Sequence, residues 1–186
     1  VVKDIVDSWK RRSVGGKFHA ILATHSIPEA IEYFRLFATM SPELKVTALF
    51  DPSIDNNGGA IFKEEGLIEV LNGYNEAFGK DFSISDHAKF KKDVSSRLAH
   101  KGSYLGVEKR PDQCLDLLIV VDQMLTGFDS KWVNTLYLDK VLKFEGLIQA
   151  FSRTNRLFGH EKRFGTICYY RRPHTMKRNA DDALRL

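Results

Sequence analysis

Residues 17–50 decide the fold of this chain, and they read KFHAILATHSIPEAIEYFRLFATMSPELKVTALF. Residues 17–24 are mostly apolar and predict a strand that is buried on both faces. Ser26, Pro28 and Glu29 then predict a helix start, because serine can cap the first turn, proline suits it and glutamate completes a capping box. Residues 44–50 predict a second strand. A strand, a helix and a strand at this spacing predict a right-handed crossover and a parallel sheet.

The rest of the chain continues this alternation. A short helix is predicted at residues 4–12, and the helix after the first strand should bury Ala30, Ile31, Phe34 and Phe37. Residues 115–121 are the clearest buried-strand pattern. Further helices are predicted at 63–78, 85–98 and 146–157, and further strands at 135–138 and 165–170. We therefore expect an α/β domain with helices on both faces of a mainly parallel sheet.

The composition is that of an ordinary globular protein. The 186 residues are 43% hydrophobic and 28% charged, and 28 basic against 24 acidic side chains give a net charge of +4. This mild excess permits contact with nucleic acid but does not require it. The basic stretch at residues 89–101 is accordingly either a solvated helix face or a face that tracks DNA.

Nothing in the chain predicts secretion, a membrane or a metal. Cys114 and Cys168 have no metal-binding spacing and predict reduced thiols, and the six histidines show no ligand pattern. No apolar run approaches the roughly 20 residues that span a bilayer, and no signal peptide is evident. We expect a cytoplasmic protein. Because the chain begins at Val1 and not at methionine, we also expect a piece of a longer polypeptide.

One run near the C-terminal end, Gln149-Ala-Phe-Ser-Arg153-Thr-Asn-Arg156, points to a polyphosphate ligand. On a helix these offsets place Gln149, Arg153 and Arg156 on one face. Each guanidinium forks onto phosphate oxygens and stays charged at any working pH. The alternative for any pair of arginines at this spacing is a merely solvated face.

A second run, Leu125-Thr-Gly-Phe-Asp129, comes after the predicted strand at 115–121. A glycine after a strand lets the backbone approach a ligand closely, here at Gly127. The carboxylate of Asp129 could then accept hydrogen bonds from ribose hydroxyls. Taken alone, this pattern is more typical of an ordinary turn with a capping aspartate than of a ligand site.

Together these runs resemble motifs V and VI of superfamily-2 helicases and translocases. The predicted strand and capped helix at residues 18–34 sit where motif IV would be. More closely, residues 116–129, 134–140 and 146–156 resemble the second motor domain of the R (restriction) subunit of type I restriction enzymes. The resemblance is strongest over residues 115–158 and extends weakly over most of the chain. It implies a RecA-like three-layer α/β/α domain at residues 1–170, with residues 171–186 beginning a following helical segment or linker.

The resemblance also implies roles for individual residues. Arg156, and secondarily Arg153, would be arginine fingers acting on ATP held by a first motor domain that this chain lacks, and Mg would bind through that domain. Gln149 would sense the γ-phosphate, and Gly127 and Asp129 would line the nucleotide cleft. Four residues would contact the DNA backbone: Thr126, Thr24, His25 and Ser26. Many relatives carry a threonine where this chain has Val121-Asp122, so the contact usually made there is not expected.

The implied partners are double-stranded DNA, the first RecA-like domain of the same parent chain, and the methylation and specificity subunits of the restriction complex. The implied activity is an ATP-dependent type I site-specific deoxyribonuclease, to which this piece alone would contribute no turnover. Two alternatives stay open. One is the helicase arm of another superfamily-2 protein, such as an excision-repair helicase, and the other is a non-motor α/β module that binds nucleic acid through Arg153 and Arg156.

Two tempting patterns are set aside. Gly15-Gly-Lys17 resembles a phosphate loop, but Phe18 replaces the required serine or threonine and the segment precedes a strand. No Walker A or Walker B pattern occurs in the chain, so it should not hydrolyse ATP alone. Glu43-Leu-Lys45 matches a step of restriction-type nuclease cores, but three residues match by chance too often, and we interpret them as a solvated start of a strand.

Overall fold

The computed structural model describes residues 1–51, 53, 59–121, 130–154, 156, 158–162 and 164–184. Its centre is a sheet of five strands in the order β2-β3-β1-β4-β5, and every pair of neighbours is parallel. The strands are β1 (His19–Thr24), β2 (Val46–Leu49), β3 (Leu117–Val120), β4 (Val133–Asp139) and β5 (Thr166–Tyr169). All six residues of β1 are buried, as expected for a central strand covered on both faces.

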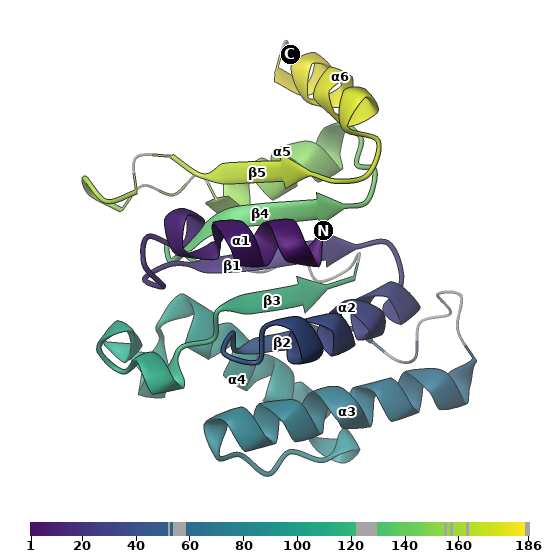
Figure 1. Cartoon of the computed structure of the whole chain (residues 1–186), viewed down its shortest axis with the longest axis vertical. Helices are drawn as coiled ribbons and strands as arrows, with labels where there is room; N and C mark the ends of the chain where they lie inside the picture. The colour runs from purple at the N-terminus through teal and green to yellow at the C-terminus, as the bar shows by residue number, and fades with distance from the viewer. Residues whose placement is uncertain are drawn as a thin grey trace.

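Helices cover both faces of the sheet, which confirms the expected RecA-like α/β/α class (Figure 1). Helices α1 and α2 lie in front of the sheet in this view, and α4 and α5 lie behind it. Helix α3 lies beside β2 and packs on α2, and α6 packs on α5. The bounds are α1 (Val2–Arg12), α2 (Ile27–Met40), α3 (Ala60–Phe78), α4 (His87–Ala99), α5 (Phe144–Thr154) and α6 (Pro173–Leu184).

Most predicted elements are confirmed, and several details differ from the prediction. Ser26 caps α2 as predicted, since its Oγ accepts from the Glu29 N–H at 3.4 Å. The Glu29 carboxylate, however, accepts from the N–H of His25 at 3.1 Å, so the capping box is not closed on Ser26 itself. The second difference concerns α5, which begins at Phe144 and ends at Thr154, three residues before the predicted end.

Helices α2 and α3 approach closely because α3 carries glycine where it meets α2. A Cβ on Gly66 would lie 2.7 Å from Cγ1 of Ile31, and a Cβ on Gly73 would lie 2.9 Å from Cζ of Phe34. Both separations are shorter than real Cβ contacts, so a larger residue at either position would force the Ile31 or Phe34 side chain to shift. Phe34 was predicted to be buried; it is half-buried against Gly73, whereas Ile31 is fully buried.

A fully buried arginine holds α4 to its neighbours. The Arg97 guanidinium lies over the Phe78 ring at 3.8 Å and over the Tyr104 ring at 4.3 Å. It donates to the hydroxyls of Tyr74 and Tyr104, each at 2.9 Å, and both hydroxyls donate to Asp93. Burial acts to raise the pKa of Asp93, but the two hydroxyls and the nearby cations outweigh it and leave that pKa lowered. The buried charge is therefore matched by partners on every side.

A pair of buried histidines lies at the amino edge of the sheet, the edge where the strands begin. Nε2 of His19 and Nε2 of His100 are 2.7 Å apart, and Nδ1 of His100 is 3.0 Å from the Glu108 carboxylate. The Trp132 ring stacks on His100 at 3.9 Å. Burial, and then the charge of His100, lower the pKa of His19 to about 3. His19 is therefore neutral at physiological pH.

Replacing Arg97 with methionine should destabilise the fold by about 3–5 kcal/mol, because Asp93 and two tyrosine hydroxyls then lose a buried partner. Urea unfolding of both chains measures the difference. Lys89→Met is the matched control, since Lys89 is exposed and pairs with Asp86 at 2.7 Å on the surface, and it should unfold like the parent. A change of less than about 1 kcal/mol for Arg97→Met would mean that packing alone holds α4.

The histidine pair should make stability depend on pH in acid. Because the folded-state pKa of His19 lies far below 6.5, the unfolded chain binds the extra proton first. The contribution is complete above pH 6.5 and is lost as pH falls towards 3, at roughly 1 kcal/mol per pH unit. His19→Gln should remove the contribution of His19 to this slope when unfolding free energies are compared between pH 6.5 and 4, whereas the contribution of His100, whose pKa burial also lowers, should remain. Parallel curves for the two chains would contradict it.

Candidate functional site

The carboxyl ends of the strands meet at one edge of the sheet, because all five strands are parallel (Figure 1). Ligands of open α/β sheets bind outside this edge. It carries the turn at residues 24–26 after β1, Asp139 and Lys140 at the end of β4, and Arg171 shortly after β5. This edge is therefore the first candidate for a binding site.

The three residues of the turn differ in their exposure. The Thr24 side chain is fully buried, and its hydroxyl donates to the Val120 carbonyl at 3.2 Å. Ser26 is buried and caps α2. The side chain of His25 is exposed. The DNA contacts predicted for these residues stay predictions, and His25 is the one whose side chain reaches solvent.

A polar network fixes this turn to two strands. The Arg171 guanidinium donates to Glu29 at 2.9 Å and lies 3.4 Å from Asp139, while the Tyr33 hydroxyl donates to Asp139 at 2.6 Å. Glu29 in turn accepts from the backbone N–H of His25. Burial, followed by the bond to Asp139, raises the pKa of Tyr33, and the bond to Glu29 raises the pKa of Arg171. The network therefore links the backbone of His25, through Glu29 and Arg171, to Asp139.

Lys140, directly after β4, is a second feature of this edge that the sequence analysis missed. Its side chain is 6% exposed, and burial lowers its pKa to about 8. A buried lysine that titrates near physiological pH at the ligand edge of a sheet is a candidate functional group. The sequence signal was a lysine immediately after a strand, but burial depends on the surrounding elements.

Helix α5, which carries two of the three predicted polyphosphate residues, lies behind the sheet and runs from the carboxyl edge towards the amino edge (Figure 1). Gln149 is exposed in its middle, and Arg153 lies in its last turn with a side chain outside the described residues. Arg156 is exposed but lies two residues beyond the helix end. Gln149 and Arg153 therefore share the predicted spacing on one helix, whereas the position of Arg156 depends on the segment between α5 and β5.

The other predicted nucleotide contacts are not placed. Thr126, Gly127 and Asp129 lie outside the described residues, and their roles stay predictions. Within the described part of the chain, no cluster of three or more histidine, cysteine or carboxylate residues could hold a metal ion. None of the described helices is long and apolar enough to cross a membrane.

The nuclease-like tripeptide lies at the opposite, amino edge. Glu43 is exposed, and its carboxylate accepts from Ser41 at 2.5 Å, while the Lys45 ammonium donates to the Pro111 carbonyl at 3.1 Å. Both residues line a cavity of about 770 Å³ together with Asp116, whose carboxylate accepts the backbone N–H of Lys45 at 2.9 Å. The lysine and carboxylates are thus bound to backbone and hydroxyl groups, in keeping with the solvated start of a strand.

Comparison with known proteins shows which family this chain resembles. The family described as type I restriction enzyme subunit R domain 3 matches residues 16–172. A type I restriction enzyme endonuclease subunit of Staphylococcus saprophyticus is 35% identical over 195 residues, covering all of this chain and 20% of the relative. One from Staphylococcus aureus strain MRSA252 is 34% identical over 194 residues with the same coverage. A putative one from Mycoplasma pneumoniae is 52% identical over 62 residues, covering 33% of this chain and 16% of the relative.

The chain thus spans about a fifth of the length of the first two relatives. The match covers β1 to β5 and the segment from Gln149 to Arg156, so the resemblance found at two short motifs extends over the whole sheet.

Replacing Arg171 with methionine should loosen the turn, because Glu29 and Asp139 lose their shared cation. The amide of His25 should exchange with solvent faster, while stability should fall by less than about 1 kcal/mol, since Arg171 is partly exposed. Hydrogen exchange measures the amide directly. The exposed neighbour Arg172, replaced in the same way, is the control. Equal exchange at His25 in both variants would show that the network does not hold the turn.

Proposed function

Because the chain belongs to the type I restriction enzyme subunit R domain 3 family, we propose that it is the second RecA-like motor domain of an R subunit. In this proposal the parent protein is an ATP-dependent translocase of double-stranded DNA and part of a type I restriction endonuclease. ATP and Mg bind between this domain and the first RecA-like domain of the parent. The methylation and specificity subunits complete the complex.

The observation that carries the proposal is the family match across residues 16–172, which include both nucleotide motifs. The structure supports it in two ways. The sheet is all-parallel and covered on both faces, the architecture of a RecA-like domain. In addition, Gln149 and Arg156 are exposed, so a ligand on a partner domain can reach them.

The proposed chemistry follows from the guanidinium group. Phosphoryl transfer spreads negative charge over the γ-phosphoryl oxygens, and a positioned arginine stabilises that charge where it develops. Arg156 is the proposed primary arginine finger, Arg153 the secondary one, and Gln149 the sensor of the γ-phosphate. Gly127 and Asp129 would line the nucleotide side of the cleft, with Asp129 near the ribose.

Movement on DNA would come from opening and closing of the two domains. Closure brings the arginines onto the phosphates, and opening after hydrolysis shifts the grip on the DNA backbone. In this domain the proposed grip involves Thr126 and the turn at residues 24–26. His25 is the exposed side chain of this turn. The network around Arg171 and Glu29 would keep the turn in place while the domain moves along DNA.

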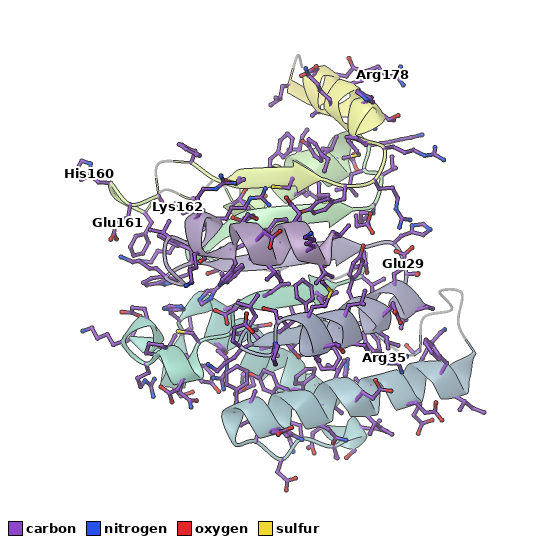
Figure 2. The ribbon with its side chains drawn as sticks, in the orientation of Figure 1. Glu29, Arg35, His160, Glu161, Lys162 and Arg178 are labelled. Carbon is purple, nitrogen blue, oxygen red and sulfur yellow. The ribbon has the colours of Figure 1, made fainter. Side chains whose placement is uncertain are left out.

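Arg156→Ala in the full-length R subunit should lower DNA-stimulated ATP turnover by about 10³-fold or more, because the developing charge loses its arginine. DNA affinity should stay within about twofold, since the finger faces the nucleotide. Steady-state ATPase assays and DNA titrations measure the two quantities. Arg178→Ala is the matched control, because this arginine is exposed on α6 and lies outside both proposed nucleotide motifs (Figure 2).

Two results would contradict the proposal. Unchanged turnover would remove Arg156 from the nucleotide site. A loss of DNA affinity with unchanged turnover per bound complex would favour the alternative of a non-motor module that binds nucleic acid.

A further inference from the structure

The chain after α5 folds back on itself beside the amino edge of the sheet (Figures 1 and 2). Phe158 and Lys162 exchange two backbone hydrogen bonds, with N···O distances of 3.0 and 3.2 Å. Gly159 supplies the left-handed conformation of the turn between them, with φ of 56°. We call residues 158–162 the clamp hairpin. It begins two residues after Arg156.

A buried ammonium ties the clamp hairpin to the start of β4. Lys162 is 3% exposed, and its Nζ donates to the carbonyls of Val133 at 2.7 Å and Lys131 at 3.1 Å. Burial, and then the positive charge of Arg156, lower the pKa of Lys162 to about 8. Arg156 is therefore close enough to act electrostatically on Lys162.

The aromatic ring of the clamp hairpin adds a second attachment. The Phe158 ring lies 4.6 Å from that of Trp132 and 5.7 Å, edge to face, from that of Phe18. An ion pair between Lys17 and Glu161 closes the outer side. Aromatic contacts of this kind stabilise a fold by more than their buried area alone. The hairpin is therefore held on its inner side by ring packing and on its outer side by the ion pair.

A third contact fixes the other side of Arg156. Thr154, the last residue of α5, is 2% exposed and packs against Gly165, just before β5. A Cβ on Gly165 would lie 2.5 Å from the Thr154 carbonyl oxygen and would also strike its side chain. The backbone of Gly165 thus approaches the end of α5 as only glycine can.

Arg156 lies midway between these attachments, two residues after Thr154 and two before Phe158. Its Cα can therefore lie no more than about 7 Å from either fixed Cα, because each residue spans at most about 3.6 Å. A residue beyond the end of its helix is not positioned by the helix itself, so these attachments restrain it instead. A displacement of about 1 Å at a catalytic group can cost about 100-fold in rate, so such a restraint has kinetic value.

We propose that Lys162 and Gly165 are positioning residues that hold Arg156 in place for the transferring phosphoryl group, an inference that rests on the proposed function. They act through Arg156 and do not touch the nucleotide. The clamp hairpin is thereby assigned a role in turnover although it lies at the amino edge, opposite the turn at residues 24–26.

The test uses the full-length R subunit in its restriction complex with DNA. Lys162→Met and Gly165→Ala should each lower ATP turnover by roughly 10- to 100-fold, with KM for ATP and DNA affinity within about twofold. Matched controls are Lys109→Met, an exposed lysine, and Gly59→Ala, where a Cβ would meet nothing within 4 Å. Both controls should turn over like the parent.

A double variant separates positioning from a general structural effect. If Lys162 acts through Arg156, Lys162→Met should add no further loss of turnover in an Arg156→Ala background. An additional loss of turnover in the double variant would overturn the inference. Normal turnover in both Lys162→Met and Gly165→Ala, with turnover impaired in Arg156→Ala, would also overturn it. Normal turnover in Arg156→Ala would instead refute the proposed function itself.

Stability is checked alongside by thermal unfolding and by hydrogen exchange of the Phe158 amide, which should become faster in Lys162→Met. Should neither clamp variant fold, Phe158→Leu fills most of the same space and loosens the hairpin more gently. It should show the same selective fall in turnover, and an unchanged turnover combined with faster exchange at residue 158 would overturn the inference.

Discussion

The structure depends on the pairing of β1 with two parallel partners, β3 on one side and β4 on the other. This places six buried residues at the centre of the sheet and leaves their backbone groups no partners except the neighbouring strands. Every further strand is added in the same direction, so all carboxyl ends lie at one edge and all amino ends at the other. Helices must then return along both faces, which produces the three layers.

The two edges consequently have different chemistry. The carboxyl edge carries an open network of carboxylates, a tyrosine and Arg171 around the exposed His25. At the amino edge lie stacked rings, a neutral histidine pair and the buried Lys162. Helix α5 runs from the carboxyl edge to the amino edge. Contacts at the amino edge therefore position a residue at the end of α5, even where that residue is proposed to act on a nucleotide. The clamp hairpin supplies part of these contacts.

Local patterns predicted the elements well where a single physical rule dominated. The apolar run of β1 and the serine cap of α2 both depend on residues close in sequence, and both are confirmed. Prediction failed where distant residues decide. The end of α5 at Thr154 coincides with its contact to Gly165, eleven positions later in the numbering. Buried Arg97 looked like part of a solvated basic stretch, because its partners Tyr74 and Tyr104 come from other elements.

The sequence by itself determined the class of fold, the order of the elements and the family, since hydrophobic periodicity, capping residues and short motifs are local properties of the chain. Only the tertiary structure decided which polar residues are buried, how Glu29 is shared between His25 and Arg171, and which contacts hold the segment around Arg156. The reason is physical. The energy of a charge depends on every group packed around it, and those groups are assembled from positions that no local pattern connects.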